Sequence, residues 1–240
     1  MIDFHTHILP DIDDGSRGEA ESIRMIEMLV DQGVKKIFLT PHFYAYLSSS
    51  GKFAEKRKKS FEILLKALEG KTMDVELYLG GEVLYFDDLW RIDSLDEFCI
   101  KGTNYILIEM PFFPWENAYV ECICKIINRG YVPIVAHFER YLKYKGNKSK
   151  IKSLVEYGCM LQMNCSYLNS AFTRGKALRY IKNGMVFALG SDCHNLSDRC
   201  PDTGAAYAIL KKKLKKNDYE LFVKKQQELT RKATVVYSSK

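Results

Sequence analysis

Histidine and carboxylate residues recur at short spacings along this chain, and their chemistry is that of metal-ion ligands. His5 and His7 are separated by one residue, and Asp192 and His194 repeat this spacing. Because alternate side chains of an extended segment point to the same side, each pair can reach a single ion. Imidazole and carboxylate without thiolate suit Zn, Mn or Fe(II) rather than a structural cysteine site. Such a centre activates water and binds a phosphoryl group.

The elements that must position these residues alternate regularly. Short runs rich in β-branched and aromatic residues, at 1–4, 34–40, 75–80, 105–109, 132–136, 160–164 and 185–189, predict strands. A capping box from Ser16 to Glu19 predicts a helix ending near Gly33, and further helices are expected at 53–68, 118–128, 151–157, 171–182 and 205–215. Seven βα units favour an α/β fold closed into a distorted TIM-like (β/α)7 barrel, with residues 1–240 as one domain, over a doubly wound sheet with a second domain.

Residues able to bind metal gather at the carboxyl ends of the predicted strands, where barrel enzymes place their active sites. In chain order they are His5 and His7, His42, Glu82, Glu109, His137, and Asp192 with His194. Only the strand at 160–164 ends without a charged ligand. A single histidine is more often structural than ligating, but all five histidines of the chain at one face favour a metal cluster. The ligands outnumber what one ion can use, so we expect more than one ion.

Composition excludes several classes of protein. Hydrophobic residues make up 47% and charged residues 28%, which excludes a disordered tail, a coiled coil and a collagen-like repeat. No apolar run approaches the length of a membrane span, and residues 1–5 show no export signal, so we expect a soluble, cytoplasmic protein whose seven cysteines are free. Lysine-rich runs at 56–59, 143–152 and 211–216 could favour anionic partners, nucleic acid among them, although solvated helix faces explain them better.

Together, the motifs resemble those of the PHP (polymerase and histidinol phosphatase) superfamily. The resemblance runs over essentially the whole chain, and its motifs are specific in combination, although a His-x-His pair alone is weak. The order and spacing are most similar to its branch of bacterial metal-dependent protein-tyrosine phosphatases from capsule and exopolysaccharide operons. The matching segments are His5-Thr6-His7, Asp13-Asp14-Gly15, Pro41-His42, Gly81-Glu82, Ile108-Glu109, Ala136 to Tyr141 and Ser191 to Asn195.

This resemblance implies an enzyme with three divalent ions, often manganese, that hydrolyses phosphotyrosine on a partner bacterial tyrosine kinase. Carried over by position, one ion would be held by His5, His7, Glu82 and Asp192, a second by Glu82, Glu109 and His137, and the third by Asp14, His42 and His194. Arg140 and Arg199 match family positions that hold the phosphate, and a guanidinium fork suits that task. Either arginine could instead be an ordinary surface residue. No general acid is assigned, because tyrosinate is a good leaving group.

Three other functions remain open from the sequence alone. Cys193 and Arg199 fit the Cys-x5-Arg spacing of a cysteine-dependent phosphatase, but the stretch lacks the glycine of a phosphate-binding loop. The metal centre could act on histidinol phosphate or on a nucleic-acid phosphate, or the protein could bind metal without catalysis. Aromatic residues of two loops could clasp a phenyl ring, or cap the barrel mouth and form a subunit contact in a homo-oligomer: Tyr44, Tyr46, Phe112, Phe113 and Trp115.

Overall fold

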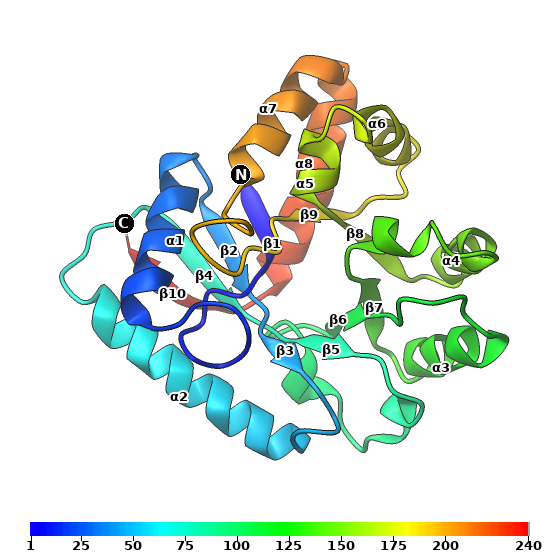
Figure 1. Ribbon diagram of the computed structural model, residues 1–240, viewed down its shortest axis with the longest axis horizontal. Helices are drawn as coiled ribbons and strands as arrows, with labels where there is room; N and C mark the ends of the chain where they lie inside the picture. Colours follow the sequence, from blue (N-terminus) through cyan, green and yellow to red (C-terminus); the bar gives the residue numbers. More distant parts are fainter. Residues whose placement is uncertain (240) are drawn as a thin grey trace.

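Parallel strands curl around a central axis in the computed structural model, which describes residues 1–239 (Figure 1). One sheet holds β1 (Ile2–Thr6), β2 (Lys36–Leu39) and β4 (Val75–Leu79), with β10 (Val235–Ser239) antiparallel to β4. The other holds β3 (His42–Phe43), β5 (Glu82–Leu84), β6 (Tyr105–Glu109), β7 (Val132–Val135), β8 (Met160–Asn164) and β9 (Ala188–Gly190), all parallel.

The two sheets form one barrel because strands continue from one into the other. Only Thr40 and Pro41 separate β2 from β3, and only two glycines separate β4 from β5, so each pair follows one strand direction. At the other side, β9 meets β1 through the Asp192 N–H, which donates to the His5 carbonyl at 2.8 Å. The structure therefore confirms the predicted distorted TIM-like barrel, with seven strand directions around its axis.

Helices cover the outside of the barrel (Figure 1). In chain order the α-helices are α1 (Glu19–Asp31), α2 (Ser50–Leu68), α3 (Asn117–Asn128), α4 (Asn147–Glu156), α5 (Cys165–Asn169), α6 (Arg174–Lys182), α7 (Thr203–Lys213) and α8 (Lys216–Lys232). Short 3-10 helices occur at η1 (Leu89–Arg91), η2 (Asp96–Phe98) and η3 (Phe138–Tyr141). The helix α2 buries Phe61, Leu64 and Leu68, whose spacing of three and four residues places them on the face toward the sheet. No helix of residues 1–239 is both long and apolar enough to cross a bilayer.

Large side chains fill the barrel interior below its mouth. The Phe4 and Phe38 rings stack with centroids 4.6 Å apart, and Phe38 stacks on Tyr78 at 4.7 Å. Leu107 and Ile134 belong to the same buried cluster. Aromatic pairs of this kind each add about 0.5–1.5 kcal/mol beyond the area that they bury. The barrel interior is therefore a packed core and not a channel.

The predicted capping box at Ser16 is wrong. The helix α1 begins at Glu19 after Gly18, and no side chain caps it. The Ser16 hydroxyl instead donates to the Gly18 carbonyl at 2.9 Å and contacts the Ser22 hydroxyl at 2.8 Å. The loop that precedes α1 folds back toward the barrel mouth, and this tertiary path overrides the local capping signal.

Candidate metal centre

An extra residue in β1 aims two histidines at the barrel mouth. Two residues lie between Asp3 and Thr6, whereas one lies between their partners on β2. Such a β-bulge changes which face the following side chains occupy. As a result His5 and His7 both point into the mouth, and their Nε2 atoms lie 3.1 Å apart. Both side chains are fully buried.

A single carboxylate connects four of the five imidazoles. Glu82 is fully buried, and its Oε2 lies 3.0 Å from His5 Nε2, 3.2 Å from His7 Nε2 and 3.1 Å from His42 Nδ1. Its Oε1 lies 3.0 Å from His137 Nε2. These contacts place Glu82, the first residue of β5, at the centre of the cluster.

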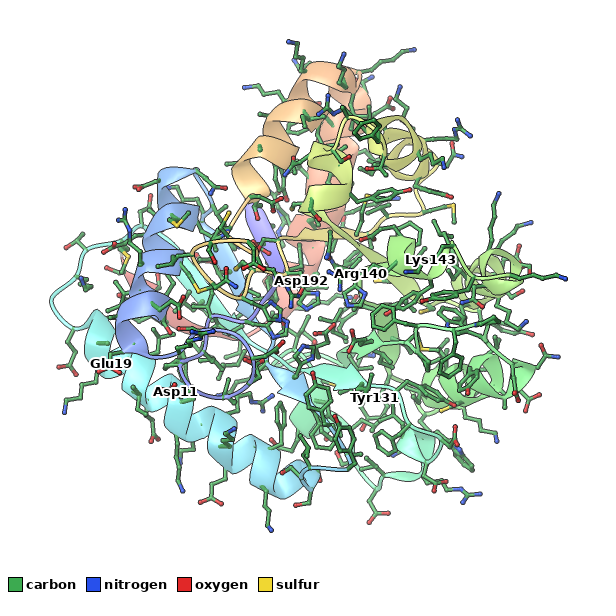
Figure 2. All side chains as sticks on the ribbon, viewed as in Figure 1. Asp11, Glu19, Tyr131, Arg140, Lys143 and Asp192 are labelled. Carbon is green, nitrogen blue, oxygen red and sulfur yellow. The ribbon has the colours of Figure 1, made fainter. Side chains whose placement is uncertain are left out.

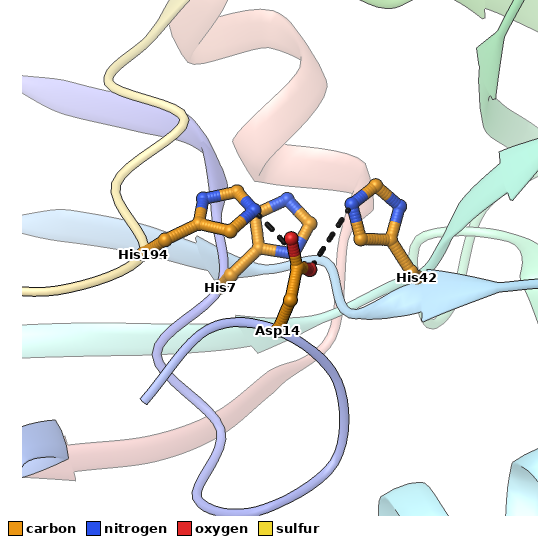
Figure 3. A group of neighbouring side chains, drawn as sticks. All are labelled: His7, Asp14, His42 and His194. Carbon is orange, nitrogen blue, oxygen red and sulfur yellow. Dashed lines mark ion pairs between the residues drawn. The ribbon is translucent and has the colours of Figure 1, made fainter. Parts of the chain in front are cut away.

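All nine residues expected as ligands come together at this mouth. Ligand atoms of three groups lie within 4.8 Å of one another: His7, Asp14, His42 and His194; His5, His7 and Asp192; and His42, Glu82 and Glu109. Figure 3 shows the first group, with Asp14 between His194 and His42. The groups overlap the expected ligand sets without matching them. His7 also joins the group of Asp14, Glu82 is absent from the group of His5, and His42 takes the expected place of His137 beside Glu82 and Glu109. His137, absent from the three groups, contacts both Glu82 and Glu109, at 3.0 and 3.4 Å.

Opposite charges in this cluster stabilise one another and shift the pKa values of its side chains. Burial alone would raise the pKa of Glu82, but His5, His42 and His137 outweigh it and lower that pKa well below its usual range. Burial would likewise lower the pKa of His137, yet Glu109 and Glu82 raise it to about 9. Glu82 is therefore ionised, and a divalent ion that binds here competes with the proton of His137.

The donor set fits divalent cations. Among the described residues, seven buried side-chain nitrogen or oxygen atoms have no hydrogen-bond partner, and three of them belong to this cluster: His42 Nδ1, Glu82 Oε2 and His194 Nε2. A buried polar atom without a partner costs about 1–3 kcal/mol. His42 Nδ1 and Glu82 Oε2 lie 3.1 Å apart without hydrogen-bond geometry, which is the arrangement of two ligands that face a common cation.

Two further residues, for which the sequence predicts no role, orient the imidazoles from behind. Asp13 Oδ2 lies 2.8 Å from His7 Nδ1, and Gln162 Oε1 lies 3.1 Å from His5 Nδ1. Each contact engages one ring nitrogen and leaves the other for the cluster. Gln162 belongs to β8, the strand expected to contribute no charged ligand, so this strand contributes an orienting amide instead.

Replacing Asp13 with asparagine is expected to weaken metal binding by about 10- to 100-fold, because His7 loses the carboxylate that orients its ring. Metal affinity is measured by titration of chelator-stripped protein against a competing indicator. Asp11→Asn in the same loop is the matched control, because Asp11 is exposed. Equal affinities in the Asp13→Asn and Asp11→Asn variants would show that Asp13 does not support the centre.

The backbone around the centre is constrained. His137 and Asp192 both adopt left-handed φ values, 30° and 56°, which cost about 1–3 kcal/mol for residues other than glycine. Gly190 lies so close to β1 that a Cβ atom there would stand 2.4 Å from His5 Cβ. The fold thus maintains strained and tightly packed backbone where the predicted ligands lie.

Two arginines flank one carboxylate at the rim of the mouth. Arg140 Nη2 lies 2.7 Å from Asp192 Oδ2, and Arg199 Nη2 lies 2.8 Å from Asp192 Oδ1. Their side chains are 38% and 36% exposed, whereas that of Asp192 is 3% exposed. Arg199 Nη1 also lies 3.9 Å from Asp14 Oδ2. Each guanidinium therefore contacts the cluster while part of its side chain stays accessible to solvent.

Cys193 is placed poorly for a phosphatase nucleophile. Its side chain is fully buried among the apolar residues under α1 and α2, and burial raises the pKa of its thiol well above the usual range. The amide of His194, which would have to face a phosphate, donates to the Arg199 carbonyl at 2.9 Å. A protonated thiol facing the core is not a nucleophile.

The aromatic residues of the two loops divide between mouth and core. Tyr44 stacks on His42 with centroids 5.0 Å apart, and Phe112 stacks on His137 at 5.9 Å. Trp115, in contrast, is 3% exposed and packs in the interior, where its indole N–H donates to the Pro111 carbonyl at 2.9 Å. Trp115 therefore does not line the mouth.

Comparison with known proteins places almost all of the chain in one family. The family model described as capsular polysaccharide synthesis, CpsB/CapC, matches residues 1–231. Tyrosine-protein phosphatase CpsB of Streptococcus agalactiae serotype III is 29% identical over 95% of this chain and 98% of its own length. Tyrosine-protein phosphatase YwqE of Bacillus subtilis is 32% identical over 88% of this chain and 84% of its own length.

A solved structure resembles the whole barrel. It is one of the crystal structures of YwqE from Bacillus subtilis and CpsB from Streptococcus pneumoniae, which are described as unique metal-dependent tyrosine phosphatases. Its TM-score is 0.81 at 27% identity, and the match covers 98% of this chain and 96% of that one. These matches confirm the family resemblance expected from the motifs. The chain belongs to the CpsB/CapC family of capsular polysaccharide synthesis.

Proposed function

We propose that this protein is a metal-dependent phosphomonoesterase that hydrolyses phosphotyrosine on proteins. The observation that carries the proposal is the buried cluster around Glu82, with Arg140 and Arg199 at its rim. The names of the relatives from Streptococcus agalactiae and Bacillus subtilis, both tyrosine-protein phosphatases, support the same activity.

The proposed cofactors are three divalent ions, with manganese preferred over iron and zinc. When bound, such ions supply a nucleophilic water at neutral pH and neutralise charge on phosphoryl oxygens. The residues that would hold them are the nine side chains of the cluster: His5, His7, Asp14, His42, Glu82, Glu109, His137, Asp192 and His194. Asp13 and Gln162 orient His7 and His5, so that their Nε2 atoms face the cluster.

The proposed role of Arg140 and Arg199 is to bind phosphate oxygens. Each guanidinium group contacts a different carboxylate oxygen of Asp192, and both side chains are exposed enough for a phosphate to reach them. A planar fork donates two parallel hydrogen bonds to a phosphate, and its charge stabilises the equatorial oxygens in the transition state. The tyrosinate leaving group, with an ordinary pKa near 10, needs little protonation.

The cellular setting belongs to the same proposal. The substrate would be a tyrosine-phosphorylated protein, foremost a bacterial tyrosine autokinase, and the enzyme would act in the cytoplasm. Residues 1–240 would act as a single domain, and a homo-oligomer is compatible with the aromatic residues exposed near the mouth, such as Tyr46 at 75% and Phe113 at 47%.

Three substrates assayed side by side test the proposed activity. With manganese-loaded enzyme, kcat/KM for a phosphotyrosine peptide is expected to exceed that for histidinol phosphate and for a 3′-phosphorylated oligonucleotide by about tenfold or more. A preference for histidinol phosphate or for the oligonucleotide would reassign the substrate while leaving the metal centre intact. Metal binding without hydrolysis of any of the three would favour a non-catalytic protein.

A further inference from the structure

A groove of about 500 Å³ lies beside the metal centre, outside the cluster of ligands. Its walls include Phe112, Arg140, Lys143, Ser166 and Tyr167. Figure 2 shows Asp192, Arg140 and Lys143 one after another along a line that leads away from the centre of the barrel mouth. The groove therefore begins at the rim of the site and extends outward past η3.

Two residues connect the groove to the centre. Arg140 lines the groove and also contacts Asp192, with Nη2 2.7 Å from Oδ2. Phe112 lines it as well, and its ring stacks on that of His137. A polypeptide whose phosphotyrosine enters the centre beside Arg140 would therefore lay its neighbouring residues against this groove.

The charge of the groove is positive at its accessible surface. Arg140 and Lys143 both line it, and no carboxylate of the described residues lies within 4 Å of the Lys143 ammonium, which sits 5.2 Å from the Tyr144 ring. The one carboxylate among the described lining residues, Glu139, is 8% exposed and accepts from the Asn164 N–H at 3.3 Å. Lys143 is thus a cation that an incoming anion can pair with.

We propose that this groove binds an acidic side chain next to the phosphotyrosine of a protein substrate. The inference rests on the proposed function, because it assigns the surface that holds the rest of that substrate. Lys143 pairs with the carboxylate, the Ser166 hydroxyl can donate to it, and the rings of Phe112 and Tyr167 pack against the peptide's aliphatic atoms. The groove then selects among phosphotyrosine sites by their neighbours, which the phosphate alone cannot do.

Two phosphotyrosine peptides that differ only in glutamate against glutamine at the flanking positions test this proposal. Glutamine keeps the size and removes the charge, so the ratio of the two kcat/KM values isolates the acidic preference. The native enzyme is expected to favour the glutamate peptide by about 1.5- to 5-fold at low salt, and less as ionic strength rises. Lys143→Glu is expected to remove or invert the preference for the glutamate peptide. Any change in turnover that is common to both peptides cancels in the ratio.

Lys145→Glu is the matched control, since Lys145 is exposed on the same segment but does not line the groove. It should leave the ratio near the native value. Equal kcat/KM values for the two peptides, or an equal effect of Lys143→Glu and Lys145→Glu on their ratio, would overturn the proposed role of the groove and leave the phosphatase activity unaffected. If the metal-loaded enzyme hydrolyses neither peptide nor a small aryl phosphate, the proposed function itself fails, and the groove's role fails with it.

Discussion

Replacing Glu82 with glutamine is expected to release bound metal and to lower kcat/KM on a phosphotyrosine peptide by more than about 1000-fold. Glutamine keeps the shape of the side chain but removes its charge and one of its two acceptor oxygens. Those oxygens contact four imidazoles at 3.0–3.2 Å, so no neighbouring group can take their place. Elemental analysis and steady-state kinetics on the same preparation measure both losses.

Glu121→Gln makes the same chemical change at an exposed position of α3 and should leave metal content and turnover unchanged. Circular dichroism establishes that both variants fold. His5→Ala and Asp192→Ala are expected to behave like Glu82→Gln, because each removes a group from the same cluster. Full metal occupancy with normal turnover in all three variants would remove these residues from the centre.

Removal of either arginine at the rim should lower activity without releasing metal. Loss of a charge-assisted contact of about 2–4 kcal/mol in the transition state lowers kcat/KM by about 30- to 1000-fold in Arg140→Ala and Arg199→Ala. Phosphotyrosine and a small aryl phosphate should be affected alike, because both present the same three phosphate oxygens. Metal content and kcat/KM on both substrates are measured, with Arg24→Ala as an exposed control on α1.

The contacts of these arginines with Asp192 make a second result informative. If Arg140→Ala or Arg199→Ala loses metal together with activity, the arginine supports the cluster through Asp192 and does not act on phosphate alone. Unchanged kinetics in both variants would reject the phosphate-binding role.

The barrel was predictable because its strands carry a strong local signal. The buried runs that form β6, β7 and β8 are mostly apolar, and the structure places them within one residue of the expected limits. Two elements gave little signal. In the helix α8 the buried apolar residues are Phe222 and Leu229, and many charged residues surround them in the sequence, so the helical period of its apolar residues is weak. The 3-residue strand β5 is too short to carry a pattern of its own and depends on pairing with β6.

The candidate site was predictable for a different reason, because parallel strands bring their carboxyl ends to one face. That rule predicts that His42, Glu82 and His137 lie together, and their contacts agree with it. Their role as ligands stays a prediction. The bulge that turns His5 inward could not be predicted, since it depends on the register between β1 and β2. The contact of Gln162 with His5 is also tertiary, spanning 157 residues of the chain.

The central claim is that turnover depends on metal at the barrel mouth and not on thiol chemistry. Its most direct test measures phosphotyrosine hydrolysis and metal content in one preparation, before chelation, after it and after addition of Mn²⁺, with Cys193→Ser assayed in parallel. Chelation should abolish turnover, Mn²⁺ should restore it, and Cys193→Ser should keep most of the native activity, because its thiol is buried and protonated. Turnover that persists in protein shown to be free of metal, or an inactive Cys193→Ser variant with normal metal content, would contradict the account.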